Sequence, residues 1–273
     1  MRSKTTLAAT VLAAAFALSA CGGSSGAEMS AADEPLKVGA SPVPHAEILQ
    51  FVKDNLADDA GLDLEIVPFT DYVQPNVALD DGSIDANYFQ TVPYLEEQEK
   101  AAGYDFTALE PVHIEPLGIY SDSLTDLADL PDGASVAIPN DPTNAGRALR
   151  LLAANDLVTL ADTGDAAPTA LDVEGNPKNL QIQEIEAAQL PRSLADVDAA
   201  VINGNYAIDA DLKPAQDALV LESAEDNPNA NLLVVRAGTE DDERIVKLEE
   251  LLHSDEVRQF IEDTYAGAVL PAF

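Results

Sequence analysis

The sequence predicts an α/β protein with two lobes and a ligand crevice between them. The chain has 273 residues, which exceeds one average domain. Short apolar segments with strand character alternate with segments whose apolar residues recur at helical spacing. Several predicted strands run directly into polar residues, and ligands of α/β folds bind beyond the carboxyl ends of strands. We therefore expect a binding site where strand ends from both lobes meet.

The first third of the chain alternates between strands and helices. Leu62, Leu64 and Ile66 alternate with polar residues as in a strand, and Ile48, Leu49, Val52 and Leu56 recur at helical spacing. Because helices separate the strands, we expect a parallel sheet with crossover connections. The predicted elements are strands at 36–40, 62–69 and 84–86 and helices at 46–57, 71–79 and 91–102.

The alternation continues without an internal sequence repeat. Residues 162–179 are rich in Asp, Gly, Pro and Asn and are predicted to form a surface excursion. We assign 35–118 and 232–273 to lobe 1 and 119–231 to lobe 2. The predicted strands are 135–138, 181–185, 198–202 and 232–236, and the predicted helices begin near Pro142, Ala187 and Asn205, with two more at 241–252 and 255–264.

The N-terminus has the pattern of a secretory signal peptide. Basic residues precede an apolar run at 7–18, which is shorter than the ~20 residues of a membrane-spanning helix. The run leads into Leu18-Ser19-Ala20-Cys21, which resembles the bacterial lipobox, and Cys21 is the single cysteine of the chain. A buried structural cysteine is the alternative.

We expect cleavage after residue 20 and lipidation of Cys21. Residues 1–20 would then be a lipoprotein signal peptide, and the small, polar and acidic residues at 21–34 a flexible tether spanning ~20 Å. The folded part would be extracytoplasmic, anchored to the cell membrane by the lipidated Cys21.

The chain is strongly acidic, with a formal net charge of −35 at pH 7. Removal of Arg2 and Lys4 with the signal peptide would make this charge two units more negative. Nucleic acid is excluded as a partner, because its binding depends on basic side chains that neutralise phosphates. Most of the acids are expected to form a solvated coat, which stabilises the protein in a salty or acidic habitat.

Residues 139–147 join a predicted strand to a predicted helix. Asp141 can cap this helix, and Pro142 suits its first turn, where no amide donor is needed. Asn144 and Arg147 are three residues apart and share one helical face. Arginine binds planar anions in a bidentate manner, so the pair predicts a carboxylate clamp. An exposed helical arginine is the alternative.

Half of the 14 Phe and Tyr residues fall between positions 69 and 106. Phe69 and Phe106 are assigned to the core. Tyr72, Phe89 and Tyr94 follow strand ends or begin helices, where aromatic rings can line a cleft. Asn203 and Asn231 can offer amide groups to the other end of a zwitterion, or serve as turn residues.

Catalytic and metal-binding motifs are scarce. The three histidines His45, His113 and His253 lack metal-ligand spacing, and the chain has neither a nucleophile elbow nor a phosphate loop. His45 follows the first strand and is the best candidate for an acid or base in the crevice. We expect a binding protein without cofactor, metal or catalytic residue, and treat an extracellular enzyme or an adhesion lipoprotein as alternatives.

Several motifs occur in the same order along the chain: Phe69–Asn76, Ile84–Gln90, Val136–Asn144, Asn176–Leu180, Gln189–Leu194 and Ala200–Asn203. From about Leu36 to the C-terminus, this set resembles the methionine-binding lipoproteins that serve ABC importers (NlpA/MetQ-like). The resemblance implies a monomeric, two-lobed protein with a periplasmic-binding-protein-like fold and a ligand in the interlobe cleft. Its implied partners are L-methionine or a related amino acid, an ABC permease and its ATPase.

The resemblance also implies a role for individual residues. The side-chain pocket would include Tyr72, Phe89 and Tyr94, and Asn144 with Arg147 would hold the α-carboxylate. Asn203 and Asn231 would fix the backbone end of the ligand. The family usually carries histidine where this chain has Thr91, so another apolar amino acid, a methionine derivative or a short peptide stays open as the ligand.

Overall fold

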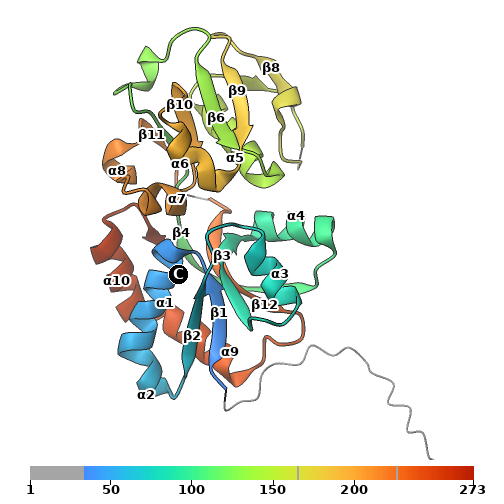
Figure 1. Cartoon of the computed structure of the whole chain (residues 1–273), viewed down its shortest axis with the longest axis vertical. Coiled ribbons are helices and arrows are strands. Elements are labelled where there is room, and N and C mark those ends of the chain that lie inside the picture. Colours follow the sequence, from blue (N-terminus) through green and yellow to red (C-terminus); the bar gives the residue numbers. More distant parts are fainter. Residues whose placement is uncertain (1–33, 165, 226) are drawn as a thin grey trace, which may run out of the picture.

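The computed structural model describes residues 34–164, 166–225 and 227–273. Its strands form two main sheets, one in each of two lobes that lie end to end along the molecule (Figure 1). The predicted signal peptide at 1–20, Cys21 and the predicted tether up to residue 33 lie outside the described residues. None of the described helices combines the length and the apolar character that a membrane crossing requires.

The sheet of lobe 1 has six strands in the order β13-β4-β12-β3-β1-β2. The pairs β1–β2 and β1–β3 are parallel, whereas β12 is antiparallel to both β3 and β4. The strands are β1 (Leu36–Ala40), β2 (Leu64–Pro68), β3 (Ala86–Thr91), β4 (Phe106–Ile114), β12 (Ala230–Arg236) and β13 (Leu270–Pro271).

Helices cover both faces of this sheet. Side chains of β12 alternate, so that Leu233 and Val235 join one core cluster and Leu232 and Val234 the other. Phe69 and Phe106 pack in the second cluster, as predicted. The helices of lobe 1 are α1 (Glu47–Val52) and α2 (Asp58–Ala60), with π-turns at Pro42–Ala46 and Lys53–Ala57, and α3 (Gln74–Asp80), α4 (Val92–Ala102), α9 (Glu243–Leu252) and α10 (Asp255–Tyr265).

The sheet of lobe 2 has five strands in the order β11-β5-β10-β6-β9, beside a two-stranded sheet, β7-β8. In β6, Val136 and Ile138 pack toward α5 while Ala137 packs toward α6. The strands are β5 (Gly118–Tyr120), β6 (Ser135–Pro139), β7 (Thr159–Leu160), β8 (Val173–Gly175), β9 (Gln181–Ile185), β10 (Ala199–Ile202) and β11 (Val220–Leu221); the helices are α5 (Pro142–Ala154), α6 (Leu190–Ser193), α7 (Gly204–Asp209) and α8 (Pro214–Asp217), with 3-10 turns at 127–129, 170–172 and 187–189.

The chain passes between the two sheets twice. It leaves lobe 1 after β4 and returns from β11 into β12, so residues 115–117 and 222–229 connect the lobes. Strands β4 and β12 are neighbours and run antiparallel, with Ile114 paired to Ala230 and His113 to Asn231. This pairing brings both interlobe connections to the same end of the lobe 1 sheet.

The α/β fold class and most element positions agree with the sequence predictions, but five details were wrong. The sheets are mixed rather than parallel, because one strand must leave lobe 1 and a neighbour must return. The strand predicted at 84–86 instead occupies 86–91, and β4 and β5 were missed. The helix predicted from Asp71 begins at Gln74. The predicted excursion at 162–179 contains strand β8.

Candidate functional site

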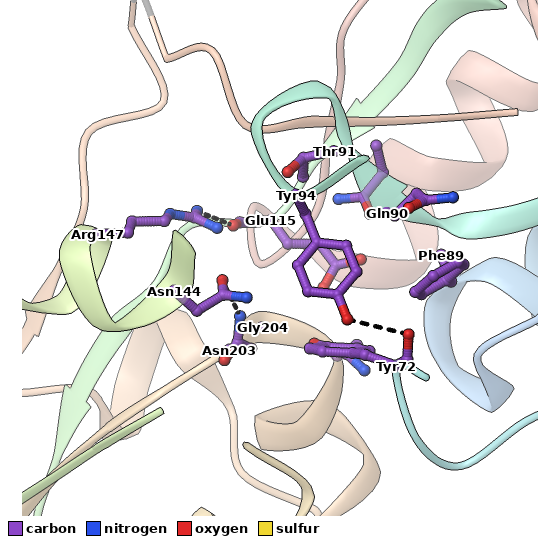
Figure 2. A pocket seen from close by; sticks show the side chains of 12 residues that line it. Tyr72, Phe89, Gln90, Thr91, Tyr94, Glu115, Asn144, Arg147, Asn203 and Gly204 are labelled. Atoms are coloured by element: carbon purple, nitrogen blue, oxygen red, sulfur yellow. Dashed lines mark hydrogen bonds between the residues drawn. The ribbon is translucent and has the colours of Figure 1, made fainter. Parts of the chain in front are cut away.

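A cavity between the two lobes has a volume of about 380 Å³, including its opening. We call it the interlobe cavity. Figure 2 shows aromatic side chains of lobe 1 on one side and Asn144, Arg147 and Asn203 of lobe 2 on the other. All eight residues predicted for the site line it: Tyr72, Phe89, Thr91, Tyr94, Asn144, Arg147, Asn203 and Asn231. Gln90, Glu115, Gly204 and Asn205 complete the lining.

Three aromatic rings form the apolar wall of the cavity. The ring centroids of Tyr72, Phe89 and Tyr94 lie 5.8 to 6.0 Å apart. The Tyr94 hydroxyl donates to the backbone oxygen of Tyr72 at 3.0 Å, and the Tyr72 hydroxyl donates to Asn205 Oδ1 of lobe 2 at 2.6 Å. Phe89 lies within β3 and does not follow a strand end, contrary to the prediction. The wall is thus rigid and connected to the opposite lobe.

Thr91 and Gln90 close the cavity where β3 runs into α4. Thr91 is the residue before α4 and is half-buried. The Gln90 amide is fixed in a buried network with Asn76 and Asn87, at 2.8 to 3.0 Å. Because its amide groups already have partners, Gln90 shapes the cavity more than it offers free groups to a ligand.

The polar wall begins at the N-terminus of α5. Asp141 caps this helix as predicted, accepting from the Asn144 amide at 2.9 Å. Its carboxylate also accepts from Asn144 Nδ2, which leaves Asn144 Oδ1 to accept from Asn203 Nδ2 at 2.9 Å. Asn203 Oδ1 is buried and has no partner among the described residues. A buried acceptor without a partner is costly, so a donor on the ligand would satisfy it.

Arg147 already has an anionic partner in the protein. Its Nε donates to both carboxylate oxygens of Glu222, at 2.9 and 3.1 Å, and its Nη2 contacts the same carboxylate and the Glu115 backbone oxygen. Burial raises the pKa of Glu222, but the guanidinium outweighs burial and holds this pKa below its ordinary value. Sequence reasoning missed Glu222. Of the three guanidinium nitrogens, only Nη1 has no hydrogen-bond partner among the described residues, and it remains available for a ligand carboxylate.

Glu115 supplies a second buried carboxylate, at the first interlobe connection. His113 Nε2 lies 2.8 Å from Glu115 Oε1, and His45 Nε2 lies 3.4 Å from the same oxygen. Asn231 Oδ1 accepts from His45 Nε2 at 3.0 Å, and the Tyr88 hydroxyl bonds to His113 Nδ1. We call these five residues the Glu115 cluster.

Burial sets the charges within the Glu115 cluster. It raises the pKa of Glu115, and it lowers the pKa of His45 to about 4 and of His113 to about 3. Both imidazoles are therefore neutral near pH 7. The sequence signal for Glu115 was weak: it is a single acid among apolar residues directly before Pro116.

The Glu115 cluster also bears on metal binding and catalysis. One donor atom each from His45, His113 and Glu115 lie within 4.8 Å of one another. Both imidazole Nε2 atoms are engaged in hydrogen bonds, so the arrangement is that of a hydrogen-bonded network. His45 is 1% exposed and does not line the cavity. The expectation that it reaches the crevice as an acid or base was wrong, because Glu115 lies between them.

Two α/β lobes joined by two connections, with a cavity lined by polar and aromatic side chains between them, define a two-lobed substrate-binding protein. The sequence model of the NlpA lipoprotein family matches residues 36–273, and the chain belongs to this family.

Relatives and solved structures agree with this assignment. The chain is 41% identical to the methionine-binding lipoprotein MetQ of Bacillus subtilis, covering 97% of each. It is 43% identical to the D-methionine-binding lipoprotein MetQ of Escherichia coli, covering 86% of this chain and 87% of that one. The structure of a nutrient-binding protein from Burkholderia cenocepacia bound to methionine superimposes with a TM-score of 0.84 at 46% identity, covering 87% and 100%.

Proposed function

We propose that this chain binds methionine as a zwitterion in the interlobe cavity. The observation that supports this most directly is the distribution of charge in the cavity wall. Arg147 Nη1 offers a guanidinium donor to the ligand, whereas Glu115 and Asn203 Oδ1 offer acceptors. An α-carboxylate and an α-ammonium group carried on one carbon fit this donor and these acceptors.

The remaining wall suits the side chain of methionine. Thioether sulfur makes favourable contacts with aromatic rings, and Tyr72, Phe89 and Tyr94 surround this part of the cavity. Thr91 borders the same region, so it can influence which apolar side chain is accepted. Two of the relatives are named for methionine or D-methionine, which makes both enantiomers necessary test ligands.

We infer a binding role without turnover, in which the lobes close on the amino acid and deliver it to an ABC permease with its ATPase. Isothermal titration calorimetry with L-methionine, D-methionine, leucine and methionine sulfoxide tests the ligand. A ligand present at 100 times its dissociation constant should also add about 2.7 kcal/mol to the free energy of unfolding. Stabilisation by none of these ligands would reject the proposal, and chemical conversion of a bound ligand would favour the enzyme alternative.

We further propose that Cys21 is lipidated after removal of residues 1–20 and anchors the protein outside the cytoplasm. The lipobox-like sequence before Cys21 supports this. Mass spectrometry of the membrane fraction should show a diacylated or triacylated N-terminal cysteine. Cys21→Ala should abolish the modification, and an unmodified cysteine in the membrane-bound wild type would contradict the proposal.

A further inference from the structure

Glu115 lines the interlobe cavity, and no described lysine or arginine forms an ion pair with its carboxylate. Its side chain is 6% exposed. The nearest guanidinium, that of Arg147, donates to the Glu115 backbone oxygen and directs its charge at Glu222. The adjacent imidazoles of His45 and His113 are neutral, because burial lowers their pKa to about 4 and about 3. Burial raises the pKa of Glu115 itself, which favours a proton on the carboxyl group of the empty site.

The hydrogen bonds around Glu115 are compatible with both of its protonation states. An ionised Glu115 accepts from His113 Nε2–H, and His113 Nδ1 then accepts from the Tyr88 hydroxyl. A protonated Glu115 donates to His113 Nε2, and Nδ1–H then donates to the Tyr88 oxygen. His113 stays neutral in both arrangements, so the two states differ by a single proton on Glu115.

We propose that Glu115 exchanges its proton for the ammonium group of the ligand, so that binding of one zwitterionic amino acid releases one proton. This inference rests on the proposed function. On binding, the O–H bond of the Glu115 carboxyl group breaks, and the proton leaves to solvent. The ammonium group of the ligand keeps its own protons and takes the place of the lost one as a donor to Glu115. The released proton carries one positive charge to solvent, so the occupied site, with the ligand carboxylate included, is one charge unit more negative than the empty site.

Other titratable groups near Glu115 influence how strongly binding depends on pH, but they do not replace Glu115 as the group that releases the proton. The groups that face it directly or through one partner are His45, His113, Tyr88, Tyr72, Tyr265, Arg147 and, beyond Arg147, Glu222. The tyrosines stay protonated, since burial raises the pKa of each. Glu222 is ionised beside Arg147, because its pKa lies below the ordinary value. Burial also raises the pKa of Asp141, but this carboxylate is hydrogen-bonded to Asn144 on the lobe 2 wall. Glu115 is the group beside the position proposed for the ammonium group whose protonation changes as the pH passes its raised pKa.

The sign of the pH effect follows from linkage. The bound ammonium group lowers the pKa of Glu115 relative to the empty site, so between these two pKa values the complex holds fewer protons than the empty protein. Affinity therefore rises with pH in this window, by up to about tenfold per pH unit, and is constant above it. Acidification weakens binding while both histidines are still neutral.

Calorimetry in buffers of different ionisation enthalpy counts the released protons. We expect methionine binding at pH 5.0 to release a measurable fraction of a proton, at most one, and this number to fall as the pH rises. The probe 4-(methylsulfanyl)butanoate lacks the ammonium group but keeps the carboxylate and thioether. It should release no proton at Glu115. Its value is first corrected for the proton that its own free carboxyl group partly carries at pH 5.0, and subtracting the corrected value removes any contribution from the Arg147–Glu222 end.

Two variants separate Glu115 from the other acids. Glu115→Gln cannot exchange a proton, so its residual affinity should be independent of pH between 5 and 7. Glu110→Gln, an identical change at an exposed position of β4, the strand that directly precedes Glu115, should behave as wild type. If Glu115→Gln fails to fold, infrared difference spectra of the wild type replace it: the carbonyl band of a protonated carboxyl group should disappear on binding.

The outcomes distinguish this inference from the proposed function. Methionine binding at pH 5.0 with no linked proton, or with the same number for methionine and its desamino analogue, overturns the proton exchange alone. An infrared spectrum without loss of a protonated carboxyl band does the same. The absence of any methionine binding overturns the proposed function instead.

Discussion

Arg147→Ala tests both the stability of the empty protein and its affinity for a ligand. The side chains of Arg147 and Glu222 are 10% and 17% exposed, and they share a bidentate contact. Breaking a fully buried pair costs about 3 to 5 kcal/mol, whereas an exposed pair contributes ~0 to 1 kcal/mol. For this mostly buried pair we expect about 2 kcal/mol. A chain of this size loses ~2 to 4 °C per kcal/mol, so the melting temperature should fall by about 4 to 8 °C.

The same substitution removes Nη1, the guanidinium nitrogen left for the ligand. Loss of a buried charge partner costs about 2 to 5 kcal/mol of binding, or roughly 30-fold to several thousandfold in affinity. Calorimetry with methionine and a thermal melt of the empty protein measure the two effects separately. Arg150→Ala is the matched control, because Arg150 is exposed one turn further along α5 and, among the described residues, its side chain hydrogen-bonds to the Ala166 backbone oxygen and to no acid.

Either measurement can refute this reasoning. Affinity within threefold of wild type would remove Arg147 from the binding site. An unchanged melting temperature would show that the Arg147–Glu222 pair contributes nothing to stability. Glu222→Gln adds a further check, since it removes the ion pair while leaving the guanidinium free to bind a carboxylate.

Three further perturbations follow from the structure. Gly204→Ala would place a Cβ 2.7 Å from Glu115 Cβ. Such overpacking costs about 1 to 3 kcal/mol of folding free energy, so the melting temperature of the empty protein should fall, and an unchanged melting temperature would show that Glu115 can move aside. Tyr72→Phe removes the 2.6 Å hydrogen bond to Asn205 across the lobes. This loss should cost about 1 kcal/mol of binding free energy, which stopped-flow fluorescence would detect as faster ligand dissociation. An unaltered dissociation rate would contradict a role for this hydrogen bond in lobe closure. Added sodium chloride should raise the melting temperature by screening the net charge of −35, and a flat response would discard the proposed adaptation to salt.

The local sequence was sufficient to predict a helix or strand where that element is determined by its own residues. Asp141, Pro142 and the apolar spacing of α5 determine that helix, and its start was predicted to the residue. Strand β4 was missed for a physical reason. It contains Glu110 and Pro111, and its register with β12 shifts at Leu232. A long strand interrupted in this way lacks the regular alternation on which a sequence prediction depends.

The polar chemistry of the cavity was predicted only in part, because much of it depends on contacts between distant segments. Asn144 and Arg147 are neighbours on one helix, and spacing alone placed them together. Glu115 obtains its environment from His45, 70 positions earlier, and from the pairing that sets Asn231 beside His113.

Glu222 is another residue whose role depends on a contact between distant segments, and this contact changes the electrostatics of the cavity. Arg147 was predicted as part of a clamp for a ligand carboxylate, yet the structure places an acid of the protein itself directly on it. The resulting pair is close to neutral, so the attraction that a ligand carboxylate experiences comes from hydrogen-bond geometry at Nη1 and less from net charge. Selectivity for a zwitterion over a simple carboxylate then depends on the other end of the cavity. There, Glu115 is the group that distinguishes the two ligands.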